Sequence, residues 1–263
     1  MKILAPNDWE IKKLIYLVLT TLLIIIDFFW FESLGINVSY LQNLVGFVFL
    51  TFIPGFLILR ICKIHTGLVE SLLYSIAISI AFIYAVGLFA NFVLPQLGIT
   101  RPISTIPIIF VISIFTLTLL VIAYIKDKKF ISQPAQFNLK ELLSPFYLLA
   151  MILPALTIFG AYMVNTYQNN TVLLIMVSFN VIPEKIYPIL LIAIAISLKL
   201  FLSLSSVHIF GHDIHIQYYF QHIVLQNGFW DWTIPDNYNS CLSLVILSPI
   251  YSLVADIKEV WIF

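Results

Sequence analysis

Residues 104–125 read STIPIIFVISIFTLTLLVIAYI and contain no charged side chain. A helix needs about 20 mostly apolar residues to cross the hydrocarbon core of a bilayer. Comparable runs lie at residues 14–31, 41–59, 69–94, 144–164 and 186–205, and shorter runs lie at 171–183 and 241–254. The sequence therefore predicts an all-α, polytopic transmembrane bundle of about seven to eight spans. The two short runs fit tilted spans, re-entrant segments or interfacial helices.

The composition of the whole chain agrees with this class of protein. Of the 263 residues, 61% are hydrophobic and 10% are charged, and the mean hydropathy is +1.03. Soluble domains carry about 25% charged residues, whereas lipid tails can solvate an apolar exterior. The formal net charge is zero, so nothing favours nucleic acid as a partner. Membrane lipid is the expected partner, and the oligomeric state stays open.

Basic residues in the short loops predict the orientation in the membrane, because cytoplasmic loops are rich in lysine and arginine. If every run crosses, one side of the membrane holds Lys2, Lys12, Lys13, Arg60, Lys63, Lys126, Lys128, Lys129, Lys140 and Lys185. The short connections on the other side hold only Arg101. We therefore expect a multi-pass protein of the cell membrane with a cytoplasmic N-terminus and an extracytoplasmic segment at residues 206–240.

That outer segment reads SVHIFGHDIHIQYYFQHIVLQNGFWDWTIPDNYNS and is far more polar than the rest of the chain. Residues 213–226 are expected to form a helix that ends at Asn227-Gly228, a common stop signal. Its apolar stripe would consist of Ile216, Tyr219, Phe220 and Ile223. Asp213, Gln217 and Gln221 would line one flank of this helix, and His215 and His222 the other. An amphipathic helix of this kind is predicted to lie along the membrane interface.

Asp213 is the strongest candidate for chemistry in this segment. A carboxylate just outside a span, at the start of an interfacial helix, could accept a proton from an acceptor hydroxyl as that oxygen attacks a sugar carbon. The same residue type is also a common helix N-cap. The sequence leaves both roles open for Asp213, and they are compatible.

The other common site chemistries find little support in the sequence. His208, His212 and His215 have helical spacing, but Gly211 interrupts that helix and no HExxH motif is present. We therefore predict no metal site. Walker, dinucleotide-binding and GxSxG motifs are absent, so no cofactor is expected. Cys62 and Cys241 are predicted to lie on opposite sides of the membrane and not to form a disulfide.

Two parts of the chain resemble known families. The run Phe52-Ile53-Pro54-Gly55-Phe56, with Arg60, Leu68-Val69-Glu70-Ser71 and Leu97-Gly98-Ile99 after it, is similar to the DUF1616 type of prokaryotic membrane protein. The run from Gly211 to Phe220, GHDIHIQYYF, resembles the DUF2206 family of archaeal membrane proteins. The later runs NGFWD at 227–231 and IPDNYNSCLS at 234–243 carry the same resemblance.

The second family looks like part of the GT-C glycosyltransferase superfamily, whose members use polyprenyl-phosphate-linked sugars. The resemblance implies an N-terminal region of about six spans at residues 1–184. It also implies the start of a GT-C-like core at 185–263, with span seven, an outer loop at 206–240 and a partial span eight. Asp213 matches the catalytic acid of the first outer loop. The residues expected to bind substrate around it are His212, His215, Gln217, Tyr218 and Asp236.

The family pattern often has Gly-Trp-Asp where this chain has Gly211-His212-Asp213. GT-C cores also carry many more spans after the first outer loop, whereas this sequence ends at Trp261-Ile262-Phe263. The resemblance therefore implies a truncated chain, which is not expected to be a complete enzyme. The alternative interpretation is a non-catalytic polytopic protein, such as a pseudoenzyme fragment, an assembly partner or a transporter fragment.

Overall fold

The computed structural model describes residues 10–34, 39–64, 68–127 and 213–259, together with three isolated residues. These four ranges belong to one compact unit of the chain, residues 4–135 and 212–263. The described ranges are helical and contain no strand. The predicted runs at 144–164, 171–183 and 186–205 lie outside the described residues.

Four long helices form the body of this unit: α1 (Ile11–Ser33), α2 (Ser39–Ile61), α3 (Leu68–Val93) and α4 (Thr105–Asp127). All four are long and apolar enough to cross a membrane, α3 together with the 3₁₀ turn η2 (Leu94–Leu97) that extends it. They coincide with the first four predicted runs, so the helical class and these four candidate spans are confirmed. The total of seven to eight spans stays a prediction. Large apolar side chains such as Leu23 and Ile106 remain exposed on the bundle, as a lipid-facing surface requires.

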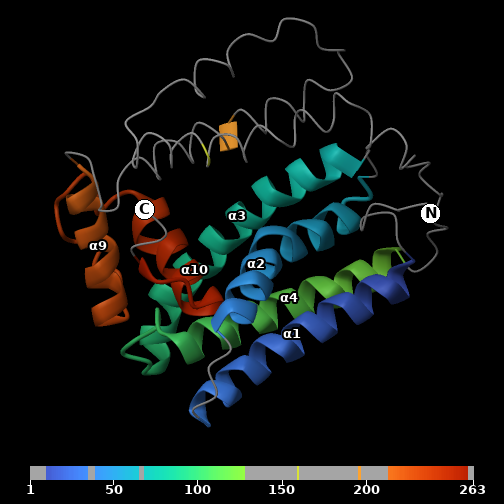
Figure 1. Ribbon diagram of the computed structural model, residues 1–263, viewed down its shortest axis with the longest axis horizontal. Helices are drawn as coiled ribbons and strands as arrows, with labels where there is room; N and C mark the ends of the chain where they lie inside the picture. Colours follow the sequence, from blue (N-terminus) through green and yellow to red (C-terminus); the bar gives the residue numbers. More distant parts are fainter. Residues whose placement is uncertain are drawn as a thin grey trace, which may run out of the picture. The chain divides into compact units, whose positions relative to one another are not determined.

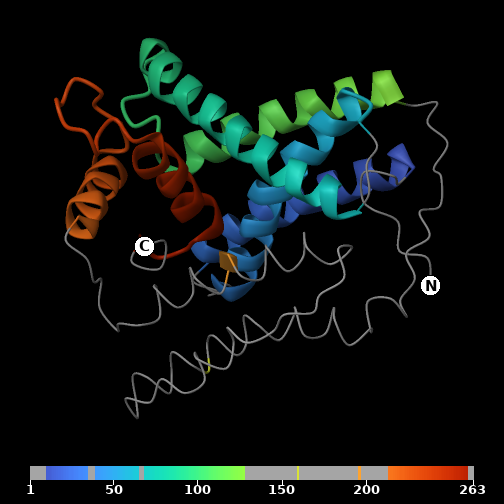
Figure 2. The same cartoon turned by 90° about the horizontal axis from the view of Figure 1, so that it is seen from above.

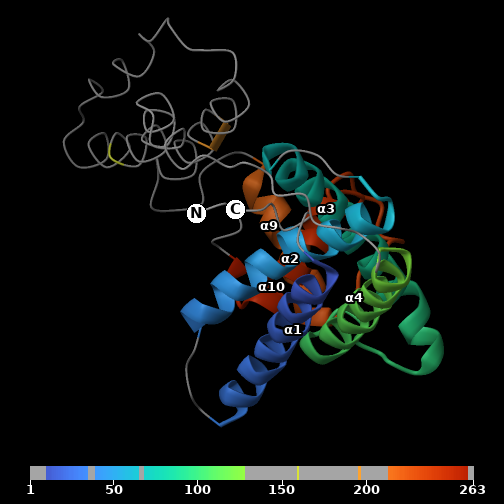
Figure 3. The same cartoon turned by 90° about the vertical axis from the view of Figure 1, so that its right-hand side faces the viewer.

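Helix α2 lies at the centre of the bundle and contacts α1, α3, α4 and α10 (Figure 3). Its closest approach is to α3, where the Cβ of any larger residue at Gly55 would lie 2.0 Å from the carbonyl oxygen of Ser75. Pro54, which lacks a backbone N–H, lies inside α2 just before this point. The Gly55 N–H donates to Ser79 Oγ of α3 at 2.8 Å. Small residues and a serine partner thus allow two backbones to touch, as is common in membrane bundles.

The four helices alternate in direction (Figure 1), so the start of α1 and the ends of α2 and α4 lie at one end of the bundle. At that end Arg60 Nε lies 2.5 Å from Asp127 Oδ2, and both side chains are buried. Lys12, Lys13 and Lys126 belong to the same end. The sequence indicated Arg60 as a topology signal and as part of the DUF1616 resemblance, whereas the structure shows that it also forms an ion pair between α2 and α4.

The last apolar run forms the π-helical turn η4 (Ser243–Leu247) followed by α10 (Ser248–Ala255). Gly87 of α3 makes room for Ile246 and Ile250, and Gly46 of α2 makes room for Ala255. These contacts fall on the half of the bundle nearest the α3–α4 connection (Figures 1 and 2). At 1.5 Å per residue, η4 and α10 together reach about 20 Å, which is less than the thickness of a hydrocarbon core. The segment Ser243–Ala255 is thus a shorter apolar helix than the four candidate spans.

Replacing Gly55 with alanine tests the close approach of α2 and α3. The added methyl group meets the Ser75 backbone, which cannot rotate away, so the free energy of unfolding should fall by about 1–3 kcal/mol. The thermal midpoint of the purified protein in detergent, followed by tryptophan fluorescence, measures this loss. Ala81→Val adds methyl groups to the exposed side of α3 and should leave the midpoint almost unchanged. Equal midpoints for the two variants would contradict the packing described above.

Candidate functional site

The candidate site lies at the end of the bundle formed by the α3–α4 connection. Helix α9 (Ile214–Asn227) crosses this end of the bundle (Figures 1 and 2). It ends where predicted, because Gly228 adopts φ 65 and its N–H donates to Val224 O at 2.8 Å. Glycine adopts that left-handed backbone conformation most readily, because it has no Cβ. The buried face of α9 consists of Phe220, Gln221 and Val224.

Specific hydrogen bonds anchor the C-terminal end of α9 to the bundle. The Ile103 N–H donates to Gly228 O at 2.7 Å, and the Arg101 guanidinium donates to Gln226 O at 2.7 Å. The Trp230 N–H donates to Asn91 Oδ1 at 2.9 Å, and Asn91 Nδ2 donates back to Trp230 O at 3.0 Å. A helix fixed in this way is a rigid support for side chains along its length.

The loop after α9 is shaped by its own polar side chains. Asp231 Oδ1 accepts hydrogen bonds from Thr233 Oγ1 at 2.6 Å and from the Thr233 N–H at 2.9 Å, and these bonds lower the pKa of Asp231. Asp236 Oδ1 accepts the Tyr238 N–H at 2.7 Å. Asn239 donates to the carbonyl oxygens of Asp231 and Ile234. Asp236 was predicted to bind substrate, and in the structure its carboxylate holds a turn.

Asp213 occupies the N-cap position of α9, but its side chain makes no capping hydrogen bond. The reason is its backbone, which has helical dihedral angles (φ −96, ψ −15) instead of the extended angles of a capping residue. The carboxylate of Asp213 is exposed. The pKa of Tyr238 is raised, first by hydrogen bonding to the Asp213 side chain and then by burial and by the charges of Asp213 and Asp236. The pKa of Tyr238 thus links Asp213 to a residue that sequence reasoning did not select.

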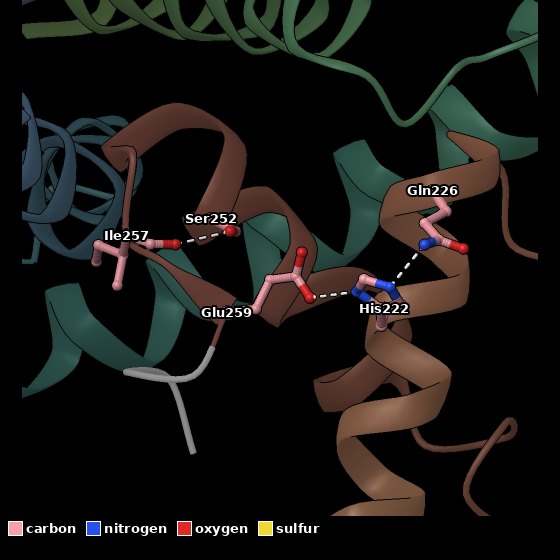
Figure 4. Close-up of polar contacts among 5 residues, drawn as sticks. All are labelled: His222, Gln226, Ser252, Ile257 and Glu259. Atoms are coloured by element: carbon pink, nitrogen blue, oxygen red, sulfur yellow. Dashed lines mark hydrogen bonds and ion pairs between the residues drawn. The ribbon is translucent and has the colours of Figure 1, made fainter.

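A second polar group lies on the flank of α9 (Figure 4). His222 Nδ1 lies 2.6 Å from Glu259 Oε2, and His222 Nε2 lies 2.7 Å from Gln226 Nε2. The ring of Tyr218 stacks on His222 with centroids 5.7 Å apart. Burial, the charge of Glu259 and a hydrogen bond to Glu259 raise the pKa of Tyr218, in that order. We call Tyr218, His222, Gln226 and Glu259 the flank cluster.

The residues predicted to form the site do not all lie in one cluster. Asp213 meets Tyr238, and Tyr218 joins the flank cluster. His215 is exposed and Gln217 is half-buried on α9, and His212 lies outside the described residues. The spacing of Tyr218, His222 and Gln226 at i, i+4 and i+8 is a signal that could have identified one face of α9. No local pattern marks Glu259, because it comes from the segment after α10.

No metal-binding group of three or more histidine, cysteine or acidic side chains occurs within the described ranges. Cys62 and Cys241 are both exposed and free. Comparisons of the chain with protein-family models, with curated proteins and with solved structures found no match. The site is therefore interpreted from its own geometry.

The bond between Asp213 and Tyr238 predicts a pH dependence. The pKa of Tyr238 is higher in the folded than in the unfolded chain, so its contribution to stability is complete below the unfolded value of about 10. That contribution is lost as pH rises through the folded pKa. In Asp213→Asn the bonded negative charge is gone, so the pKa of Tyr238 should fall towards its ordinary value.

An ultraviolet titration of tyrosine ionisation, with Tyr238→Phe subtracted to isolate this one phenol, measures the change. Asp231→Asn is the matched control, in the same loop as Tyr238, and should leave the pKa of Tyr238 unchanged. An unchanged Tyr238 midpoint in Asp213→Asn would show that the two side chains do not interact.

Proposed function

We propose that this chain is a membrane glycosyltransferase-like protein, or the N-terminal part of one, that transfers a sugar from a polyprenyl-phosphate-linked donor at the outer face of the membrane. The observation that carries this proposal is the state of Asp213. Its carboxylate is exposed at one end of an apolar bundle, is not used as a helix cap, and raises the pKa of the nearby Tyr238. The resemblance of residues 211–220 to GT-C-like proteins supports the same residue.

The chemistry needs a base near the acceptor and little else from the protein. An ionised carboxylate offers about four lone-pair sites, so Asp213 can accept the Tyr238 hydrogen bond and still accept the proton of an acceptor hydroxyl. The acceptor oxygen then attacks the anomeric carbon, and the bond from that carbon to the phosphate oxygen breaks. The lipid phosphate leaves with the electron pair of that bond. Because a phosphate is a good leaving group, this step needs no general acid.

The proposed orientation follows from the distribution of charge over the bundle. Lys12, Lys13, Lys63 and Lys126 belong to the end opposite α9, whereas Arg101, and Lys258 next to Glu259, belong to the end that holds α9. The rule that basic residues stay inside then assigns the N-terminus to the cytoplasm and the loop after α9 to the outer side. This assignment supports an outer segment at 206–240 within a core region at 185–263.

The exposed surface of α9 supports an interfacial position. Ile216 and Tyr219 are exposed on α9, and Trp232 is 60% exposed in the loop that follows. Tryptophan and tyrosine are enriched at the headgroup layer of membranes. An acid at the start of such a helix would meet the sugar of a lipid-linked donor, and the acceptor that attacks it, while the polyprenyl tail stays in the bilayer.

Sugar release from labelled polyprenyl-phosphate hexoses, measured with the purified chain in lipid nanodiscs, tests the proposal. Asp213→Asn keeps the shape of the side chain but removes its basicity, so the rate should fall by about 100-fold or more. Asp231→Asn should keep the rate, because Asp231 only holds a turn. An unaltered rate in Asp213→Asn would remove this residue from the mechanism. A wild-type chain that releases sugar from none of these donors would favour the non-catalytic alternative.

A further inference from the structure

Both ring nitrogens of His222 have a partner within the flank cluster. His222 Nδ1 contacts only a carboxylate oxygen of Glu259 and must donate to it. His222 Nε2 contacts the amide nitrogen of Gln226, which has no lone pair to offer. These two contacts are satisfied together when Nδ1 carries the proton and Nε2 accepts. In this arrangement Nε2 directs its lone pair at the Gln226 amide.

Glu259 is held in place from outside α9. Ser252 Oγ donates to Ile257 O at 2.7 Å just before Glu259 (Figure 4). The hydroxyl of Ser39 contacts the carboxylate of Asp256 one residue earlier. Both contacts fix the short segment after α10 against the bundle. The imidazole is thus oriented by a positioned carboxylate, which leaves the far nitrogen, Nε2, to face Gln226.

The accepting nitrogen can be reached by a ligand. The side chain of His222 is 37% exposed, and that of Glu259 is 26% exposed. The residue that now covers Nε2 is Gln226, which is itself exposed near the end of α9. Its long side chain can rotate away at small cost, leaving an acceptor nitrogen, an amide and a carboxylate beside one another. Acceptors and donors at such spacing match a ligand with several hydroxyl groups.

We propose that the flank cluster is a saccharide-binding subsite in which a sugar hydroxyl donates to His222 Nε2 in place of the Gln226 amide. The released amide and Glu259 then bind neighbouring hydroxyls of the same sugar. The choice of a saccharide over another polyol rests on the proposed function. His222 lies nine residues after Asp213, roughly 13 Å along α9. The two groups cannot contact one hydroxyl, so the subsite binds a sugar unit remote from the reacting one, and the substrate is an oligosaccharide.

Acylation of the histidines by diethyl pyrocarbonate tests both parts of this proposal, because this reagent attacks unprotonated imidazole nitrogen. The purified chain in nanodiscs is treated at neutral pH, and mass spectrometry follows His222, with the exposed His215 of the same helix as internal reference. Gln226→Ala uncovers Nε2, so acylation of His222 should be several-fold faster while that of His215 is unchanged. Asn227→Ala is the adjacent control and should change neither rate.

The ligand class is tested with neutral sugars as probes: mannose, glucose, galactose, N-acetylglucosamine and their disaccharides. At least one of them should slow acylation of His222 several-fold and leave that of His215 unchanged. Failure of all of them, or equal slowing of both histidines, would overturn the saccharide subsite. Protection of His222 in a chain without transfer activity would keep the subsite and remove the proposed reaction. Transfer activity without protection of His222 would keep the proposed reaction and overturn the subsite.

Discussion

The close approach of α2 and α3 at Gly55 is the constraint on which the described structure depends. Gly55 meets the backbone of Ser75, and its N–H bonds to the hydroxyl of Ser79. A water-excluding environment makes that hydrogen bond important, because a backbone donor left alone in lipid costs several kcal/mol. The bond joins the backbone of α2 to a side chain of α3 beside Pro54.

The position of α3 then determines where the candidate site lies. Asn91 near its end bonds to both backbone groups of Trp230, and the connection after it bonds to the last turn of α9. The other end of the site depends on α2, because Gly46 allows Ala255 to approach and Ser39 contacts Asp256. The positions of Asp213 and His222 thus depend on α2 and α3, two helices that are far from them in the sequence.

The sequence was most informative where one local signal decides the structure. The apolar runs predicted α1 to α4, and Asn227-Gly228 predicted the end of α9, because these features depend on composition and on one residue's backbone preference. The buried face of α9 was harder to predict. Of the four residues in the predicted stripe, Phe220 is buried while Ile216 and Tyr219 are exposed, and Gln221 from the polar flank is fully buried. A helix that contacts protein on one face and a different medium on another has no single amphipathic pattern.

The contacts of the site itself were beyond the reach of sequence patterns. Tyr238 meets Asp213 across 25 positions of the chain, and Glu259 meets His222 across 37. Neither Tyr238 nor Glu259 lies at a sequence spacing from α9 that would predict these contacts. The burial of Arg60 with Asp127 was missed for the same reason, since its partner belongs to a helix two elements later. Tertiary pairing of polar groups is decided by packing, which local periodicity does not describe.

The central claim is that the end of the bundle with Asp213 faces the outer water, and two thiols at opposite ends can test it. Asn237→Cys, combined with Cys241→Ser, places one exposed thiol in the loop beside Tyr238, while native Cys62 remains exposed at the end with Arg60. A membrane-impermeant maleimide should label the loop thiol in intact cells and Cys62 only after lysis. Labelling of Cys62 in intact cells, with the loop thiol protected until lysis, would invert the topology and contradict the account.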